Sequence, residues 1–175
     1  DKKIVIEHFK EERNKHVVFH TLYGRRVNDV ISRAIAFAIS KTQNHDVEFS
    51  VSDNGFMLSY SGNLQAAKAF SSIKSKDLRK IMEIALDKTE ILKRRFRHCA
   101  ARGLMILRNY KGYQKTVGRQ QVSSTLLLSA VKRISEDYPL LKEARREVLE
   151  DLMDIEHAAY VIKKIEAGEI KIIET

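Results

Sequence analysis

The sequence predicts an α+β fold, in which a small antiparallel sheet joins a mostly helical C-terminal two-thirds. Three observations predict this class. Two β-rich apolar runs lie near the start of the chain, and an Asn-Gly pair separates two further runs. After residue 62 the apolar residues recur at helical spacing, until a last apolar run at residues 170–173. That run predicts a strand that returns to the N-terminal sheet.

Residues 1–62 are predicted to form the β-rich part, with four strands and one helix. Residues 4–9 and 15–22 concentrate β-branched and aromatic side chains, so they can form an antiparallel pair. Residues 25–40 have the apolar spacing of a helix. Residues 47–51 and 56–60 flank Asp53-Asn54-Gly55. Because Asn-Gly accepts the positive φ angles of a tight turn, these two runs predict a β-hairpin.

Residues 63–168 are predicted to be helical, and residues 169–175 hold the closing strand, so the chain is interpreted as one segment. Ser75, Thr89 and Asp154 stand where side chains cap helices, and Pro139 stands where proline opens one. A basic loop is expected at residues 109–118. The predicted helices cover residues 64–70, 76–86, 89–108, 120–134, 139–153 and 154–167.

Composition excludes several classes of protein. With 43% apolar residues in 175, the chain can bury a core. The single cysteine, Cys99, excludes a disulfide framework and a cysteine-rich zinc site, and it favours a reducing, cytoplasmic location. No apolar run reaches about 18 residues, so no membrane partner is expected. The start has no Met and no signal-peptide pattern. We therefore expect a natural or trimmed segment of a longer polypeptide.

The net charge is concentrated in residues 89–119. This block has nine basic residues and one acid, Glu90, whereas the rest of the chain has 23 basic and 22 acidic residues. Such a block predicts a surface for a polyanion, most often nucleic acid. A solvated helix face or a dock for an acidic partner remains open. The nine residues are Lys93, Arg94, Arg95, Arg97, Arg102, Arg108, Lys111, Lys115 and Arg119.

A helical wheel divides the 89–108 helix into two sides. An apolar sector predicts the core side, and five basic residues lie outside it: Arg94, Arg95, Arg97, His98 and Arg102. Gly103 lies in the apolar sector, where a missing Cβ lets another helix approach. Leu104 and Met105 make the last turns apolar on most sides, so we expect this end to be buried. The apolar sector holds Leu92, Phe96, Cys99, Ala100, Gly103, Ile106 and Leu107.

Phosphate contact is the role predicted for seven cations of this block, because guanidinium and ammonium groups bind phosphate. Arg97 lies near the flank of the helix and can instead pair with another domain. Tyr110 and Tyr113 lie among the loop cations, where they can stack on bases or anchor the loop. The seven are Arg94, Arg95, Arg97, Arg102, Lys111, Lys115 and Arg119.

Arg25 and Arg26 are secondary candidates, because they open a predicted helix whose backbone amides attract anions. The alternative is local pairing, since Asp29 stands three residues after Arg26 and four before Arg33.

No catalytic or cofactor-binding motif is present. The sequence has neither a GxxxxGK[ST] loop nor a GxGxxG fingerprint, and no serine stands in a nucleophile elbow. Residues 154–157, DIEH, imitate the acidic box of helicases, but a predicted helix precedes them, which favours a capping role for Asp154. His16 and His20 can share one face of a strand, which leaves a weak possibility of a metal pair. We expect no catalytic, cofactor or metal residue in this segment.

Several stretches resemble the large helicase-related family of superfamily 2 ATP-dependent helicases, in its archaeal type. They are LYGRRVN at residues 22–28 with SRA at 32–34, RFRHCAARGLMILR at 95–108, KG at 111–112, VGRQQ at 117–121, EVLEDLMD at 147–154 and IEAGEI at 165–170.

The resemblance implies a DEAD/H-associated accessory domain that follows two RecA-like domains and a winged helix. It implies a parent helicase that hydrolyses ATP with Mg and moves 3′ to 5′ on single-stranded DNA, unwinding DNA or RNA–DNA hybrid, with a DNA-repair role. This segment would then help to hold the translocated strand. The family's wedge tryptophan has no counterpart in this chain, which has no Trp. The alternative is an interaction module that docks on the motor domains without contacting nucleic acid.

Overall fold

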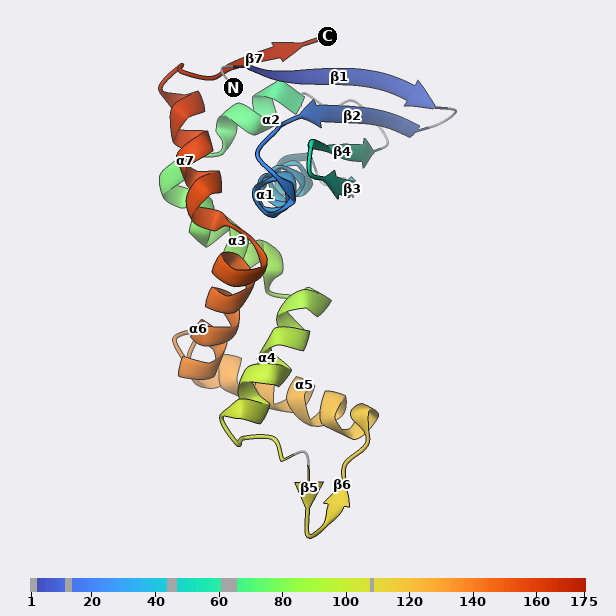
Figure 1. The fold of residues 1–175 in the computed structure, drawn as a ribbon, viewed down its shortest axis with the longest axis vertical. Helices are drawn as coiled ribbons and strands as arrows, with labels where there is room; N and C mark the ends of the chain where they lie inside the picture. Colours follow the sequence, from blue (N-terminus) through green and yellow to red (C-terminus); the bar gives the residue numbers. More distant parts are fainter. Residues whose placement is uncertain (1–2, 12–13, 44–46, 61–65, 108) are drawn as a thin grey trace. The chain divides into compact units, whose positions relative to one another are not determined.

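The computed structural model describes residues 3–11, 14–43, 47–60, 66–107 and 109–175. They form two compact units. Unit 1 is Asp1–Ala85 with Met153–Thr175, and unit 2 is Leu86–Leu152. The α+β class is confirmed (Figure 1). The sequence-based division into a β-rich part, a helical part and a closing strand, with boundaries at residues 62 and 168, stays a prediction. The two compact units are instead separated between residues 85 and 86 and between residues 152 and 153.

Unit 1 is built on a five-stranded sheet in the order β3-β4-β2-β1-β7. The closing strand returns to the N-terminal sheet as predicted, and Ile4 of β1 lies opposite Ile172 of β7. That pair is parallel, so the expected antiparallel sheet is wrong at this edge and the sheet is mixed. Parallel pairing requires a long crossover connection, which the intervening helices supply. The strands are β1 (Lys3–Glu11), β2 (Asn14–His20), β3 (Val47–Ser52), β4 (Gly55–Tyr60) and β7 (Lys171–Glu174).

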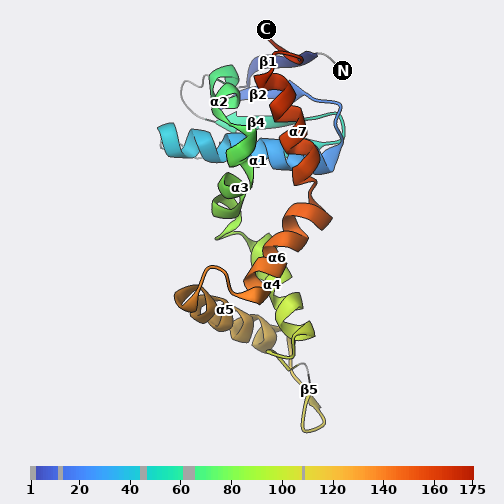
Figure 2. The same cartoon turned by 90° about the vertical axis from the view of Figure 1, so that its left-hand side faces the viewer.

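Helices pack against this sheet and fill the core of unit 1. Helix α1 (Arg25–Gln43) contacts β3, β4, α2 and α7 (Figure 2). Phe19 of β2 stacks on Phe56 of β4 at 4.4 Å between ring centroids and meets Phe70 of α2 edge-on at 5.8 Å. The other helices are α2 (Ala66–Ser72), the 3-10 turn η1 (Ser75–Asp77), α3 (Leu78–Leu86), whose last residue belongs to unit 2, and α7 (Ile155–Glu166).

The β3–β4 hairpin is confirmed, but for a different reason than the one predicted. Ser52 pairs with Gly55, so the turn residues are Asp53 and Asn54. Gly55 lies in β4, where a Cβ would stand 2.1 Å from the carbonyl oxygen of Phe19. The glycine therefore permits a close approach of two backbones rather than a positive φ at the turn.

A buried asparagine joins this hairpin to the start of α1. The side-chain amide of Asn28 donates to the carbonyl oxygens of Thr21, Ser52 and Asp53 at 3.0, 3.0 and 3.2 Å. Its Oδ1 accepts from the Thr21 hydroxyl at 2.9 Å, and the residue is fully buried. One side chain thus satisfies backbone acceptors from two loops that the sequence separates by about thirty residues.

Unit 2 is helical apart from one small hairpin. Helix α4 (Glu90–Arg102) packs against α5 (Val117–Ile134) and α6 (Pro139–Arg146), and α6 continues into the π-helical segment η2 (Glu147–Leu152). The expected loop at 109–118 contains β5 (Asn109–Tyr110) and β6 (Tyr113–Gln114), so the loop prediction is wrong there.

Helix α4 ends six residues before the predicted end at Arg108. Leu104 has a φ of 57°, and the amides of Leu104 and Met105 donate to the carbonyls of Ala101 and Ala100. This is a Schellman end in which leucine takes the left-handed position that usually belongs to glycine. The glycine stands one residue earlier, because a Cβ at Gly103 would lie 3.1 Å from the Leu140 side chain of α6. The predicted close helix approach is therefore confirmed.

The expected burial of this helix end is wrong. Leu104 is 76% exposed and Met105 is 50% exposed, because the chain leaves the helix before these residues reach the α4–α6 contact.

Replacing Asn28 with alanine should lower the free energy of unfolding by about 2–3 kcal/mol, because buried carbonyl oxygens lose their donor. Urea unfolding of the 175-residue chain measures this change. Asn109→Ala is the matched control, since Asn109 is exposed and should change stability little. Equal stability of the two variants would show that Asn28 does not hold the loops together.

Candidate nucleic-acid interface

Helix α4 is oriented by its apolar side. Thr89 caps the helix, because its hydroxyl oxygen accepts from the Leu92 amide at 3.4 Å. Leu92, Phe96 and Cys99 are buried, as the helical wheel predicts. Burial raises the pKa of the Cys99 thiol, although the nearby Arg102 guanidinium acts in the opposite direction. The packing therefore directs the basic side chains of α4 away from the core of unit 2.

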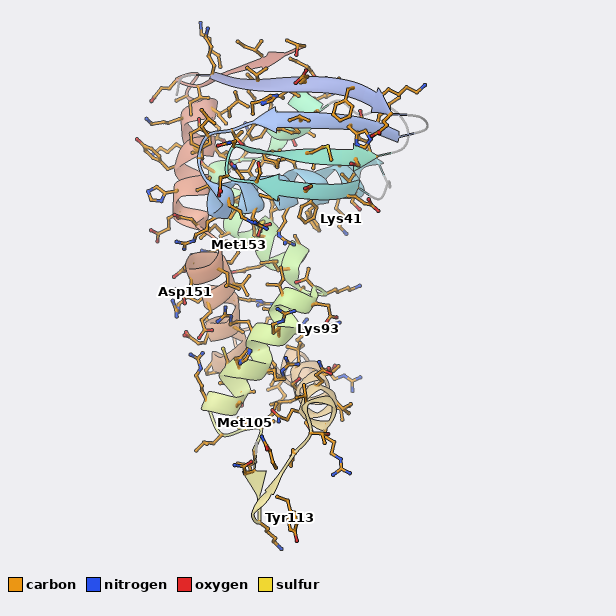
Figure 3. The ribbon with its side chains drawn as sticks, turned by 45° about the vertical axis from the view of Figure 1, so that its right-hand side comes forward. Lys41, Lys93, Met105, Tyr113, Asp151 and Met153 are labelled. Carbon is orange, nitrogen blue, oxygen red and sulfur yellow. The ribbon has the colours of Figure 1, made fainter. Side chains whose placement is uncertain are left out.

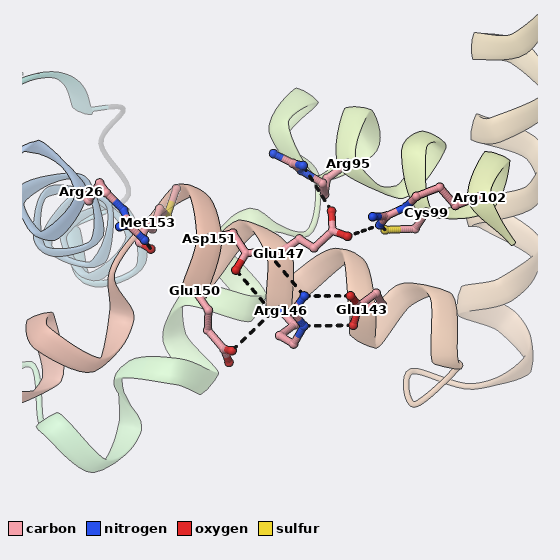
Figure 4. A network of polar contacts seen from close by, with 10 residues as sticks. All are labelled: Arg26, Arg95, Cys99, Arg102, Glu143, Arg146, Glu147, Glu150, Asp151 and Met153. Atoms are coloured by element: carbon pink, nitrogen blue, oxygen red, sulfur yellow. Dashed lines mark hydrogen bonds and ion pairs between the residues drawn. The ribbon is translucent and has the colours of Figure 1, made fainter.

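Two of these arginines bind one buried carboxylate. The Glu147 side chain is only 4% exposed. Its Oε2 accepts from Nη1 of Arg95 at 3.2 Å, and its Oε1 accepts from Nη2 of Arg102 (Figure 4). The same Arg102 nitrogen lies 3.3 Å from Sγ of Cys99. Both guanidinium groups thus hold α4 to the start of η2, and this shared use of one carboxylate reduces the charge they offer to a ligand.

A second ion-pair network covers the opposite side of α6 and η2. Arg146 makes two hydrogen bonds with Glu143, at 2.9 and 3.0 Å, and lies within 4 Å of Glu150 and Asp151 (Figure 4). The hydrogen bonds from Arg146 hold the pKa of Glu143 below its usual value. The acids of α6 and η2 are therefore already bound by arginines of unit 2.

Arg94 and Arg97 are the α4 arginines that keep their charge available. Arg94 is exposed and Arg97 half-buried, and neither forms an ion pair within the described part of the chain. The nearest acid, Glu90, is bound by Lys93 at 2.7 Å. That hydrogen bond lowers the pKa of Glu90, and the positive charges of Lys93, Arg94 and Arg97 lower it further.

The hairpin and the start of α5 carry the remaining predicted cations. Thr116 caps α5 by accepting from the Arg119 amide at 3.4 Å, and Gln120 donates to the carbonyl oxygen of Lys115 at 2.9 Å. Arg119 is exposed and Lys115 half-buried, and neither forms an ion pair among the residues described. Lys111 lies in the hairpin turn and is exposed. Gln120 therefore serves the local backbone.

Tyr113 is 80% exposed, so it does not anchor the hairpin on the helices. Figure 3 shows its side chain on the hairpin, away from the helices of unit 2. The Tyr110 side chain and all of Arg108 lie outside the described residues.

In unit 1, Arg25 and Arg26 lie at the start of α1, where the backbone has local partners. The Arg25 amide donates to Oδ1 of Asp53 at 3.3 Å, so the chain's own carboxylate lies where an anion would bind. Nη2 of Arg26 donates to the Met153 carbonyl oxygen at 2.9 Å. Asp29 pairs with Arg33 at 2.7 Å, as the local-pairing alternative expects.

The histidine pair gives no metal site within the described residues. Nε2 of His20 lies 3.1 Å from Glu7, and Nδ1 of His16 lies 2.9 Å from the Ser59 hydroxyl. No group of three or more possible metal ligands gathers in the described ranges. The described helices likewise include none that is long and apolar enough to cross a membrane.

Sequence reasoning missed an apolar stripe on α5. Val122, Leu126 and Ile134 are 62%, 67% and 73% exposed; Val122 and Leu126 lie on the side of the helix away from the buried Leu128 and Val131, and Ile134 lies between the two sides. Their spacing of four and eight residues is visible in the sequence, but a helix that is apolar on two sides gives no single stripe to assign to the core.

Comparisons with curated proteins agree with the resemblance found in the sequence. The chain is 52% identical over 158 residues to the ATP-dependent helicase Lhr-Core of Methanothermobacter thermautotrophicus, which covers 90% of this chain and 18% of that protein. It is 28% identical over 173 residues to the Lhr helicase/uracil glycosylase of Escherichia coli, covering 97% of this chain and 11% of that protein. The chain thus spans about a fifth or less of the length of these relatives.

A solved structure has the same fold. The Mycobacterium smegmatis helicase Lhr bound to ssDNA and AMP-PNP matches all of this chain with a TM-score of 0.85 and 26% sequence identity, over 22% of that protein. The family model described as DEAD/H associated matches residues 1–175. With the whole chain matched and the fold shared, the chain belongs to the DEAD/H associated family of helicase segments.

Proposed function

We propose that this chain is a nucleic-acid-binding accessory domain of an ATP-dependent 3′–5′ DNA helicase, and that it helps to hold the translocated single strand. One observation carries the proposal. Arg94, Arg97, Lys115 and Arg119 are cations of unit 2 without an ion pair in the described ranges. No Asp or Glu stands between Glu90 and Glu136 in the sequence to neutralise them. Cations without an ion pair attract phosphate groups, whose binding releases counterions.

Not all nine predicted contacts receive equal support. The guanidinium groups of Arg95 and Arg102 are bound to Glu147, and that of Arg26 to a carbonyl oxygen. We therefore assign phosphate contact first to Arg94, Arg97, Lys115 and Arg119, together with Lys111 in the exposed turn. Arg25 is a secondary contact, because its side chain is exposed but its helix start already has the Asp53 carboxylate.

The activity belongs to the parent helicase rather than to this segment. We propose that the parent binds ATP and Mg in two RecA-like domains, that these domains and a winged helix precede this segment, and that the parent acts in the cytoplasm on DNA or RNA–DNA hybrid. The names of the relatives support the ATP dependence and the helicase activity. The ssDNA named with the Mycobacterium smegmatis helicase supports a single-stranded ligand.

A second candidate function is docking on the motor domains without contact to nucleic acid. The exposed apolar side chains of α5, Val122, Leu126 and Ile134, favour it, because large apolar side chains exposed on one helix are typical of a surface that another domain covers. The two functions are compatible in one domain, since the stripe and the unpaired arginines of α4 lie on different helices.

Replacing Arg94 and Arg97 together with alanine should weaken binding of the 175-residue chain to single-stranded DNA. It should also reduce the slope of log K against log salt by about 1.4, because two phosphate contacts are lost at about 0.7 each. Fluorescence anisotropy at several salt concentrations measures both quantities.

The matched control is Lys76→Ala with Lys80→Ala, which removes the same charge from exposed positions of unit 1. Equal loss of affinity in the two double variants would show that the effect comes from net charge and not from contacts of Arg94 and Arg97. If the wild-type chain bound no strand even at low salt, docking alone would remain.

Glu147→Ala should destabilise unit 2 by on the order of 2 kcal/mol, because the variant loses the buried carboxylate that Arg95 and Arg102 share. Thermal or urea unfolding measures the loss. Glu143→Ala is the control, since its pair with Arg146 lies half-exposed and should contribute little. Equal unfolding curves would show that the two arginines do not depend on Glu147.

A further inference from the structure

The β5–β6 hairpin presents an aromatic ring on a short, well-defined turn. Tyr110 pairs with Tyr113, so Lys111 and Gly112 form a two-residue turn. Their φ angles of 50° and 81° are the positive pair of a type I′ turn, whose twist matches that of the two flanking strands. Glycine at the second position adopts this conformation without strain, and a Cβ there would meet nothing within 4 Å. The turn thus sets the direction of Tyr113.

Tyr113 projects into solvent among cations. Its ring is 80% exposed, and the next residues along the chain include Lys115 and Arg119. Exposing the apolar ring of a tyrosine to water is unfavourable when no contact compensates for it. The position of Tyr113 on a projecting turn therefore favours a ligand with a flat apolar face. A base of an unpaired strand has such a face, and the phosphates beside it match the neighbouring ammonium and guanidinium groups.

We propose that Tyr113 stacks on an unpaired base of the bound strand, and that the hairpin is the element of this domain that distinguishes single strands from duplex. The proposal rests on the proposed function, which supplies the strand. It deepens that function, because phosphate contacts alone bind both forms of nucleic acid, whereas stacking requires a base whose face is open. In this arrangement Arg94 and Arg97 of α4 bind the phosphates of the strand, and Tyr113 stacks only where a base is unpaired.

The absence of tryptophan from this chain permits a direct measurement. Tyr113→Trp introduces the only indole, and its emission should be quenched when oligo(dT) of about 12 nucleotides binds, a length that spans one such site. Tyr160→Trp is the control, because Tyr160 is 55% exposed on α7 in unit 1 and is not one of the residues of the basic block. Its emission should change little.

Binding by Tyr113→Ala measures the contribution of the ring. The variant should bind oligo(dT) roughly 5- to 150-fold more weakly, the range for one stacked base, whereas Tyr113→Phe should bind as the wild type does. The salt slope should stay unchanged in both variants, because no charge is removed. Thermal unfolding should also stay unchanged, since an exposed side chain contributes little to stability.

An abasic strand of the same length separates bases from phosphates. The wild type and Tyr113→Ala should bind it equally, because it offers phosphates and no face on which to stack. Duplex DNA of that length should likewise give equal affinities for the two proteins.

The outcomes distinguish the two proposals. Salt-dependent binding of oligo(dT) with equal affinities for wild type and Tyr113→Ala would overturn stacking and leave the proposed function in place. An equal loss of affinity for the abasic strand would overturn it too, because the ring would then act without a base. No binding of the wild type at low salt would contradict the proposed function itself, and stacking with it.

Discussion

The contact between Glu147 and the two arginines of α4 is the constraint on which unit 2 depends. A carboxylate that is 4% exposed is costly to bury unless cations compensate it, and Arg95 and Arg102 do so from positions about two turns apart on one helix. Their positions fix the rotation of α4 against η2. Together with the apolar packing of Leu92, Phe96 and Cys99, this ion pair determines which basic residues of α4 remain at the candidate binding surface.

In unit 1 a buried hydrogen-bond network joins the loops around the start of α1. The buried amide of Asn28 ties the start of α1 to the β3–β4 turn, and the Asp53 carboxylate accepts from the Arg25 amide. The segment LYGRRVN therefore contributes mostly to the fold. Of its two arginines, Arg26 supports the junction before α7 through the Met153 carbonyl oxygen. The predicted phosphate contacts that form no ion pair among the described residues, Arg94, Arg97, Lys115 and Arg119, accordingly all lie in unit 2, on α4 and around the start of α5.

Particular residues show how far sequence reasoning extends. The apolar sector was predicted correctly for Leu92, Phe96, Cys99 and Ala100, because burial follows the helical period, but Leu107 of that sector is exposed. The same wheel predicted a close helix approach at Gly103, and the structure gives Leu140 as the neighbour there. The β5–β6 hairpin was missed, since lysine is uncommon at a positive φ and Lys111-Gly112 gave no turn signal as clear as Asn-Gly. The parallel β1–β7 pair was missed as well, because an apolar run predicts a strand but not its direction. The role of individual cations stays a prediction.

The sequence by itself determined the fold class, the family, the order of the elements and the location of the basic block, because these depend on periodicity, composition and local motifs. Only the tertiary structure decided which basic side chains are bound in ion pairs within the domain. Glu147 stands 52 residues after Arg95 and 45 after Arg102, and nothing local links them. Pairing depends on distance in space, whereas sequence records only distance along the chain. The exposure of Tyr113 depends on how the turn leaves the helices, and this too is set by packing.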